Sequence, residues 1–209
     1  MPTSRSALKV HSDQAGALAT LSMGLEAELR ALGADRRPVV FACIGTDRST
    51  GDALGPLVGQ RLRRLGHTED EVVGTLEDPL HALNLAERLR PRMRERPRPL
   101  IVAVDAALGT LPSVGSVRVR RGGLRPGEGV GKDLPQIGEL AVAGTVNVRA
   151  GLMDAQVLQC TRLFMVQTLS ELIASACWWS LRTIRREAAA AAEPEPRAGG
   201  ATTGFEAVA

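Results

Sequence analysis

The sequence predicts an α/β fold built on a mostly parallel sheet. Two apolar runs, residues 38–44 and 99–106, lack polar alternation, which is typical of strands buried on both faces of a parallel sheet. The segments beside them repeat apolar residues at spacings of three and four, the pattern of helices packed on a sheet. The order strand, helix, strand, helix, strand is that of α/β proteins.

The elements before the second apolar run are predicted as follows. Ser12 and Asp13 can cap a helix that runs to about Leu32 and ends at Gly33. After strand 38–44 come a helix, a short strand and a second helix, namely residues 52–65, the stretch EVVGTL, and about Leu80 to Met93.

The second half of the chain continues the pattern. Residues 99–106 form a strand that is apolar up to Asp105, and VGSVRVR and GELAVAGTVNV predict two more strands. Residues from about 153 to 186 predict one long helix or two. The expected organisation is an N-terminal helical extension, a single α/β domain and a disordered, low-complexity tail, over residues 1–37, 38–187 and 188–209.

Composition excludes several classes of function. With 209 residues and 44% hydrophobic content, the chain can bury a core of one domain. The net charge is only +3, and the densest basic stretch, residues 88–99, lacks interleaved aromatics, so we expect no nucleic-acid partner. The apolar stretch 163–181 is interrupted by Gln167, Ser170 and Glu171, which argues against a membrane span.

Cysteine usage predicts the compartment. Cys43, Cys160 and Cys177 lie far apart, their number is odd, and no zinc spacing occurs. We therefore expect the three cysteines to be free thiols in a reducing compartment. The N-terminus has no apolar stretch of signal-peptide length, so a cytoplasmic protein is expected.

The strand-to-helix stretch CIGTDRSTGDALGP (residues 43–56) carries more polar residues than a plain turn needs. It has no GK[ST] ending and no GxGxxG, so it is not a nucleotide-binding loop. An aspartate where the helix starts would also repel a phosphate. No GxSxG surrounds any serine, which disfavours a serine hydrolase.

Two aspartates stand out by position. Asp52 follows the first strong strand and Asp105 ends the second, and ligand sites of α/β sheets form beyond the carboxyl ends of strands. If the strands are neighbours, one carboxylate can stay ionised while the other holds a proton. Asp52 is then the base and Asp105 the proton donor. Both could instead ionise around a metal, and Asp52 could simply stabilise a helix dipole.

Other polar residues are weaker candidates. Thr46, Asp47, Arg48 and Ser49 would line the mouth of the site and hold substrate, and Asp47 could equally stabilise the turn. Asn147 could orient a substrate amide or close a turn. His81 is a candidate metal ligand, but no second histidine stands at ligand spacing.

Uncommon stretches occur in a familiar order: CIGTDRSTGDALGPLVG, GTLEDPLHALNL, AVDAALG, VGSV, PGEGVGKDLPQIGEL and GTVNV. Over residues 38–185 the chain resembles the YyaC-type sporulation protein family. That family is similar to the germination protease and, more distantly, to the hydrogenase-maturation endopeptidases. The resemblance implies a three-layer α/β/α sandwich of the phosphorylase/hydrolase-like kind and a cytoplasmic or forespore location.

The resemblance also implies a site. The germination protease places catalytic aspartates in a D-A-L-G-P loop and a strand-ending D-A motif, which match Asp52 and Asp105. The maturation endopeptidases add a downstream histidine to bind nickel. No histidine follows His81 here, so no cofactor is expected, although a divalent metal stays open.

The hypothesis is a sporulation-related peptidase in which Asp52 and Asp105 activate water on a peptide bond of a protein or peptide substrate. One alternative is a non-catalytic binding or scaffold protein on the same fold. Another is a hydrolase of a non-protein amide or glycosidic bond. The adjacent Trp178 and Trp179 leave open whether they form a homo-oligomer interface or close the core.

Overall fold

The computed structural model describes residues 8–124 and 136–192. The strands are β1 (Leu8–His11), β2 (Val39–Cys43), β3 (Val72–Val73), β4 (Leu100–Gly109), β5 (Ser116–Arg121) and β6 (Leu140–Val148). The α-helices are α1 (Ala17–Ala31), α2 (Leu54–Arg64), α3 (Leu85–Met93), α4 (Asp154–Gln159) and α5 (Leu163–Ala192). The PGEGVGKDLP stretch (residues 126–135) lies outside the described residues, as does the predicted tail beyond Ala192.

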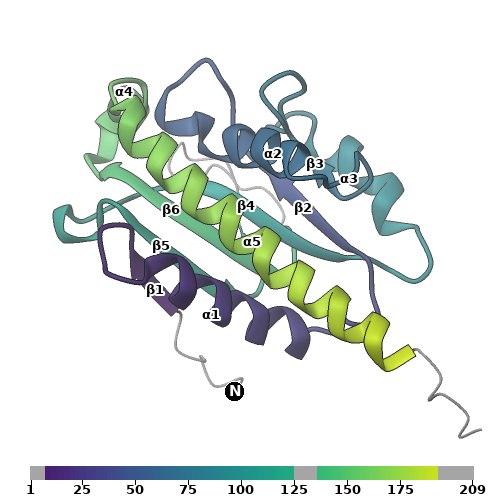
Figure 1. Cartoon of the computed structure of the whole chain (residues 1–209). Helices are drawn as coiled ribbons and strands as arrows, with labels where there is room; N and C mark the ends of the chain where they lie inside the picture. Colours follow the sequence, from purple (N-terminus) through teal and green to yellow (C-terminus); the bar gives the residue numbers. More distant parts are fainter. Residues whose placement is uncertain (1–7, 125–135, 193–209) are drawn as a thin grey trace, which may run out of the picture.

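The described strands form one sheet in the order β1-β5-β6-β4-β2-β3 (Figure 1). Pairs β2–β3, β2–β4 and β4–β6 are parallel, whereas β5 is antiparallel to both β1 and β6. Five strands therefore run in one direction and β5 in the other. The predicted α/β class with a mostly parallel sheet is confirmed.

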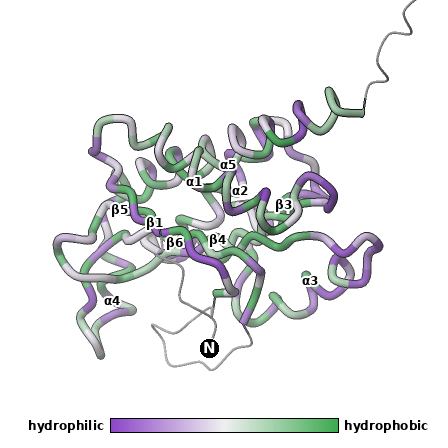
Figure 2. Tube along the Cα trace, turned by 90° about the horizontal axis from the view of Figure 1, so that it is seen from below, coloured by the Kyte–Doolittle hydropathy of each residue, from purple (hydrophilic) through white to green (hydrophobic). Residues whose placement is uncertain are grey.

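Helices cover both faces of the sheet unequally (Figure 2). Helices α1, α2 and α5 lie on one side and α3 on the other. The larger core packs Leu21, Leu54 and Ile173 of these helices against alternate strand residues such as Phe41 and Val102. A smaller core joins Leu85 and Leu89 of α3 to the opposite strand faces. The fold is thus a three-layer α/β/α sandwich, and β2 and β4 read as unbroken apolar runs because both faces are covered.

The N-terminal segment differs from the expectation of a helical extension. Residues Leu8–His11 pair with β5 as an edge strand, and α1 buries Leu21, Leu25 and Leu29 against α5. The helix begins at Ala17 after Gly16, not at Ser12, because the residues before it are extended and turn. This segment is part of the domain.

The C-terminal helical region is two helices. Helix α4 ends at Gln159, and α5 starts at Leu163 and runs to Ala192, five residues past the predicted domain boundary. Its 30 residues make a rod about 45 Å long. Among the described residues, no helix is both long and apolar enough to cross a membrane.

Candidate active site at the carboxyl edge of the sheet

Backbone hydrogen bonds hold two other segments of the chain against the end of β2, where the candidate site begins. The amide of Ile44 donates to Val104 O at 2.8 Å, and the amide of Gly45 donates to Leu80 O at 2.8 Å. The first bond places Asp105, which follows Val104, beside the chain leading to Asp52. The second places His81, which follows Leu80, on the opposite side. Three chain segments therefore converge beyond one strand end.

The loop after β2 folds back because Gly45 permits it. Gly45 has φ 143°, and a Cβ there would lie 1.9 Å from the backbone oxygen of Asp52. The same oxygen accepts a hydrogen bond from the amide of Thr46 at 3.2 Å. The loop is thus closed on itself, and Asp52 stands in a short 3-10 turn, η1 (Gly51–Ala53), before α2.

Helix α4 supplies the remaining wall. Gly51 allows a close approach, since a Cβ there would lie 2.9 Å from both the side chain and the backbone oxygen of Leu158. Asn147 anchors this helix region to β6, donating from Nδ2 to Val157 O at 3.3 Å and to Thr161 Oγ1 at 3.2 Å. The structure thus places Asn147 behind α4, with its amide nitrogen already hydrogen-bonded.

These elements enclose a cavity of about 250 Å³, here called the acid pocket. Its polar side chains include Ser49, Asp52, His81 and Asp105. The other lining residues come from the end of β2, the His81 turn and α4: Ile44, Gly45, Ala82, Ala155, Leu158 and Gln159. Asp52, in the turn after β2, and Asp105, in the neighbouring parallel strand β4, therefore line one cavity, as expected.

Asp105 lies differently from its prediction. Strand β4 continues four residues beyond it, to Gly109, because Ala106–Gly109 pair with β6. Asp105 therefore sits inside the strand, where it is half-buried and lines the acid pocket. Its Oδ1 accepts a hydrogen bond from the amide of Ala106 at 2.8 Å.

The two carboxyl groups have different acidities. Burial raises the pKa of Asp105 well above its usual value, the negative charge of Asp52 raises it further, and the Ala106 amide acts in the opposite direction. Burial also raises the pKa of Asp52, opposed by the amide of Thr46. Asp52 consequently ionises first, and Asp105 retains its proton beside it.

Two polar atoms near this pair lack partners. His81 Nδ1 and Ser49 Oγ are buried and have no hydrogen-bond partner among the described residues. The backbone of His81 is held by its amide, which donates to Asn84 Oδ1 at 2.9 Å. A buried polar atom without a partner is costly, so a bound water or substrate group would satisfy both atoms.

The other predicted mouth residues lie outside the acid pocket. Asp47 and Arg48 are exposed on the loop, and Thr46 Oγ1 accepts the Arg48 amide at 3.3 Å. Within the described residues, no group of three or more His, Cys, Asp or Glu side chains is arranged to hold a metal. The donors therefore do not fit a nickel triad, and the expectation that the protein has no cofactor stays a prediction.

Asp105 should make stability depend on pH. Its raised pKa means that the folded chain keeps a proton that the unfolded chain releases near pH 4. The contribution of Asp105 to the free energy of unfolding is therefore largest below about pH 4. It falls by up to about 1.4 kcal/mol per pH unit as the pH rises toward the pKa of Asp105 in the folded chain. Urea unfolding from pH 4 to 8 should show this decline in the wild type and a weaker one in Asp105→Asn.

The exposed Asp35→Asn variant is the matched control for that titration, since it removes a carboxyl group from the surface. It should keep the wild-type decline. Parallel curves for wild type and Asp105→Asn would contradict a buried, protonated Asp105.

Comparison with known proteins places the chain. The family model described as "Protein of unknown function (DUF1256)" matches residues 9–176. The chain belongs to this family. The match includes β1 and α1, in keeping with their place in the sheet and core. YyaC of Bacillus subtilis (strain 168), described as an uncharacterized protein, is 46% identical over 151 residues, which are 72% of this chain and 73% of YyaC. The predicted kinship with YyaC is confirmed.

One solved structure is a more distant match. The [NiFe] hydrogenase maturation protease HycI from Thermococcus kodakarensis KOD1 aligns with 76% of this chain and 99% of its own, at 16% identity and a TM-score of 0.47. A likeness this distant says nothing about the chemistry of this chain. The relation to the germination protease stays a prediction.

Proposed function

We propose that the acid pocket hydrolyses a peptide bond, with Asp52 as general base and Asp105 as general acid. The observation that carries this proposal is the pairing of two carboxyl groups of unequal acidity in one cavity. General acid–base catalysis needs one group that accepts a proton and one that gives it. We also propose, from the resemblance, that the protein acts in the cytoplasm or forespore of a sporulating bacterium.

The steps follow from the protonation states. Ionised Asp52 takes a proton from water, and the resulting hydroxide oxygen bonds to the carbonyl carbon of the substrate. Asp105 gives its proton to the departing nitrogen as the C–N bond breaks, which leaves a carboxylic acid and an amine. The proton on Asp52 then returns to Asp105 through solvent. Ser49 Oγ and His81 Nδ1 are placed to orient the water or the substrate.

The surroundings of the pocket favour a polypeptide substrate. The acid pocket is smaller than most small-molecule sites, so it suits one segment of a longer chain. Exposed large apolar side chains follow the carboxyl ends of β3, β4 and β6: Leu83, Leu111, Leu152, Met153, Leu163 and Phe164. Exposed apolar residues in these segments offer contacts to apolar groups of another chain.

A cleavage assay with isotope labelling tests the proposal. The full chain is incubated with a library of denatured bacterial proteins in H₂¹⁸O, and new peptide ends are identified by mass spectrometry. We expect new C-termini that carry ¹⁸O, with apolar residues near the cut, and none with Asp52→Asn. If the library binds but no new end forms above that control, the chain is a binding protein on this fold.

A further inference from the structure

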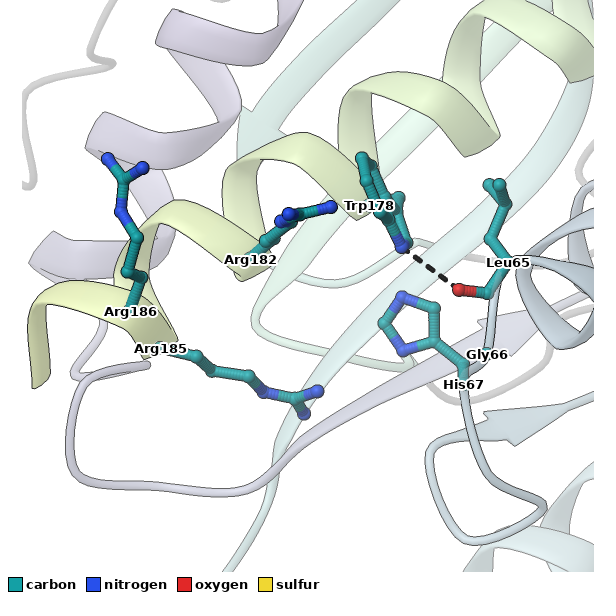
Figure 3. Close-up of a pocket in the computed structure, with 7 residues that line it drawn as sticks. All are labelled: Leu65, Gly66, His67, Trp178, Arg182, Arg185 and Arg186. Carbon is teal, nitrogen blue, oxygen red and sulfur yellow. Dashed lines mark hydrogen bonds between the residues drawn. The ribbon is translucent and has the colours of Figure 1, made fainter. Parts of the chain in front are cut away.

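A second cavity lies at the amino ends of the parallel strands, opposite the acid pocket at their carboxyl ends. Helix α2 starts at the carboxyl ends of the strands and returns to their amino ends, where Leu65, Gly66 and His67 follow it. There it meets the second half of α5. The cavity, of about 360 Å³, is lined by Leu65, His67, Trp178, Arg182, Arg185 and Arg186 (Figure 3). We call it the arginine pocket.

The pocket is rich in positive charge. Trp178, Arg182 and Arg185 recur at spacings of four and three, so they share one face of α5. Arg185 forms an ion pair with Glu71, the only acid that pairs with any of the three arginines among the described residues. Arg182 and Arg186 have no carboxylate partner in those residues, and Figure 3 shows the Arg186 guanidinium at the periphery. Among the described residues, the three arginines of the pocket thus have a single carboxylate partner between them.

The aromatic wall is held in place. Trp178 donates from Nε1 to Leu65 O at 3.0 Å, which ties α5 to the end of α2. The guanidinium of Arg182 lies over the Trp178 ring, 4.8 Å from its centroid. The Trp178 indole and the Arg182 guanidinium stacked on it therefore line the pocket together.

His67 supplies the feature that points to a ligand. The residue is 7% exposed, and its Nδ1 lies 2.9 Å from Glu71 Oε2. Its Nε2 is buried without a hydrogen-bond partner among the residues that the structure describes. Burial lowers the pKa of His67, so at neutral pH the ring is neutral. With the proton on Nδ1 facing Glu71, Nε2 is an acceptor that needs a donor.

We propose that the arginine pocket binds a small phosphomonoester. At neutral pH a phosphomonoester is partly protonated, because its second pKa is about 6. Its P–OH group can donate to His67 Nε2 while its other oxygens accept from the arginines. A carboxylate at the same pH has no proton to donate. The cavity is larger than a phosphate, so it has room for an organic part beside Trp178 and Arg182.

Intrinsic fluorescence gives a direct test, since the chain has two tryptophans, no tyrosine, and both tryptophans at this place. The full chain is titrated with inorganic phosphate, ribose 5-phosphate, ribose and succinate. We expect saturable changes with both phosphates, tighter for ribose 5-phosphate, and none with ribose. In ¹⁵N spectra of the three histidines, the Nε2 signal of one ring should shift on binding and be absent in His67→Gln.

Calorimetry on variants assigns the site. Arg182→Gln should raise the Kd for ribose 5-phosphate about tenfold or more, the effect of one charge-assisted hydrogen bond. Arg90→Gln removes the same charge from the exposed surface of α3 and should leave the Kd unchanged. The proposal is overturned by equal effects of the two variants, by succinate binding as tightly, or by no saturation up to about 10 mM phosphate probe. It stands independently of peptide hydrolysis at the acid pocket.

Discussion

Asp52→Asn and Asp105→Asn are each expected to lower kcat for peptide hydrolysis by about 10²- to 10⁴-fold, the usual contribution of one general acid or base. Asp52→Asn removes the base that accepts the proton of water. Asp105→Asn removes the proton donor but closely matches the shape of the protonated carboxyl group, so its unfolding free energy near pH 7 should be close to or above that of the wild type. Rates are measured on a peptide found by the cleavage assay, and stability by urea unfolding.

The pH dependence of the hydrolysis rate is a second test of the roles of Asp52 and Asp105. Activity needs Asp52 ionised and Asp105 protonated, and both pKa values are raised by burial. The rate should rise with pH to a maximum above pH 4 and then fall as Asp105 loses its proton. Asp47→Asn, on the exposed surface of the same loop, should retain activity. Equal activity in all three Asn variants would exclude the acid pair from the chemistry.

Gly45→Ala is expected to destabilise the fold by about 4 kcal/mol or more, a size that only backbone clashes and similar defects reach. Its Cβ would lie 1.9 Å from a backbone oxygen of Asp52 and 3.0 Å from Pro56 Cδ, in a conformation that favours glycine. The oxygen is the backbone oxygen of Asp52 itself, so relief of the clash must displace Asp52. Urea unfolding measures the loss.

Gly66→Ala is the matched control for Gly45→Ala. Gly66 also has a positive φ, 98°, but a Cβ there meets nothing within 4 Å. It should cost only the conformational strain, about 1–2 kcal/mol. A Gly45→Ala protein no less stable than Gly66→Ala would show that the loop after β2 relaxes without moving Asp52.

Much of the sheet could be predicted because its strands are buried on both faces. The unbroken apolar runs identified β2 and β4. Asp52, after the first run, and Asp105, at the predicted end of the second, indicated the candidate site. The end of β4 was missed by three residues, since Ala107, Leu108 and Gly109 are extended only because β6 lies beside them. Strand β1 was missed because it is four residues long and its partner β5 is distant in sequence.

The candidate site was predictable in part. Ser49, Asp52 and His81 follow strands and Asp105 lies in the second half of one, so their positions in the sequence indicated a shared edge of the sheet. The role of Asn147 was not accessible, because its partners on the α4 turn are set by tertiary packing. The arginine pocket could not be predicted from the sequence for a similar reason. The spacing of Trp178, Arg182 and Arg185 was visible, but the buried His67 opposite them comes from the end of α2.

The edge position of β1 has a consequence for synthesis on the ribosome. Leu8 pairs with Val119, and α1 packs against α5, so both partners of the leading segment emerge late. At about 5–20 residues per second, β5 emerges at least about five seconds after β1. Until then the apolar stripe Leu21, Leu25 and Leu29 has no core to join. Docking of residues 8–31 is therefore a late step of co-translational folding, and for those seconds their apolar side chains stay open to other proteins.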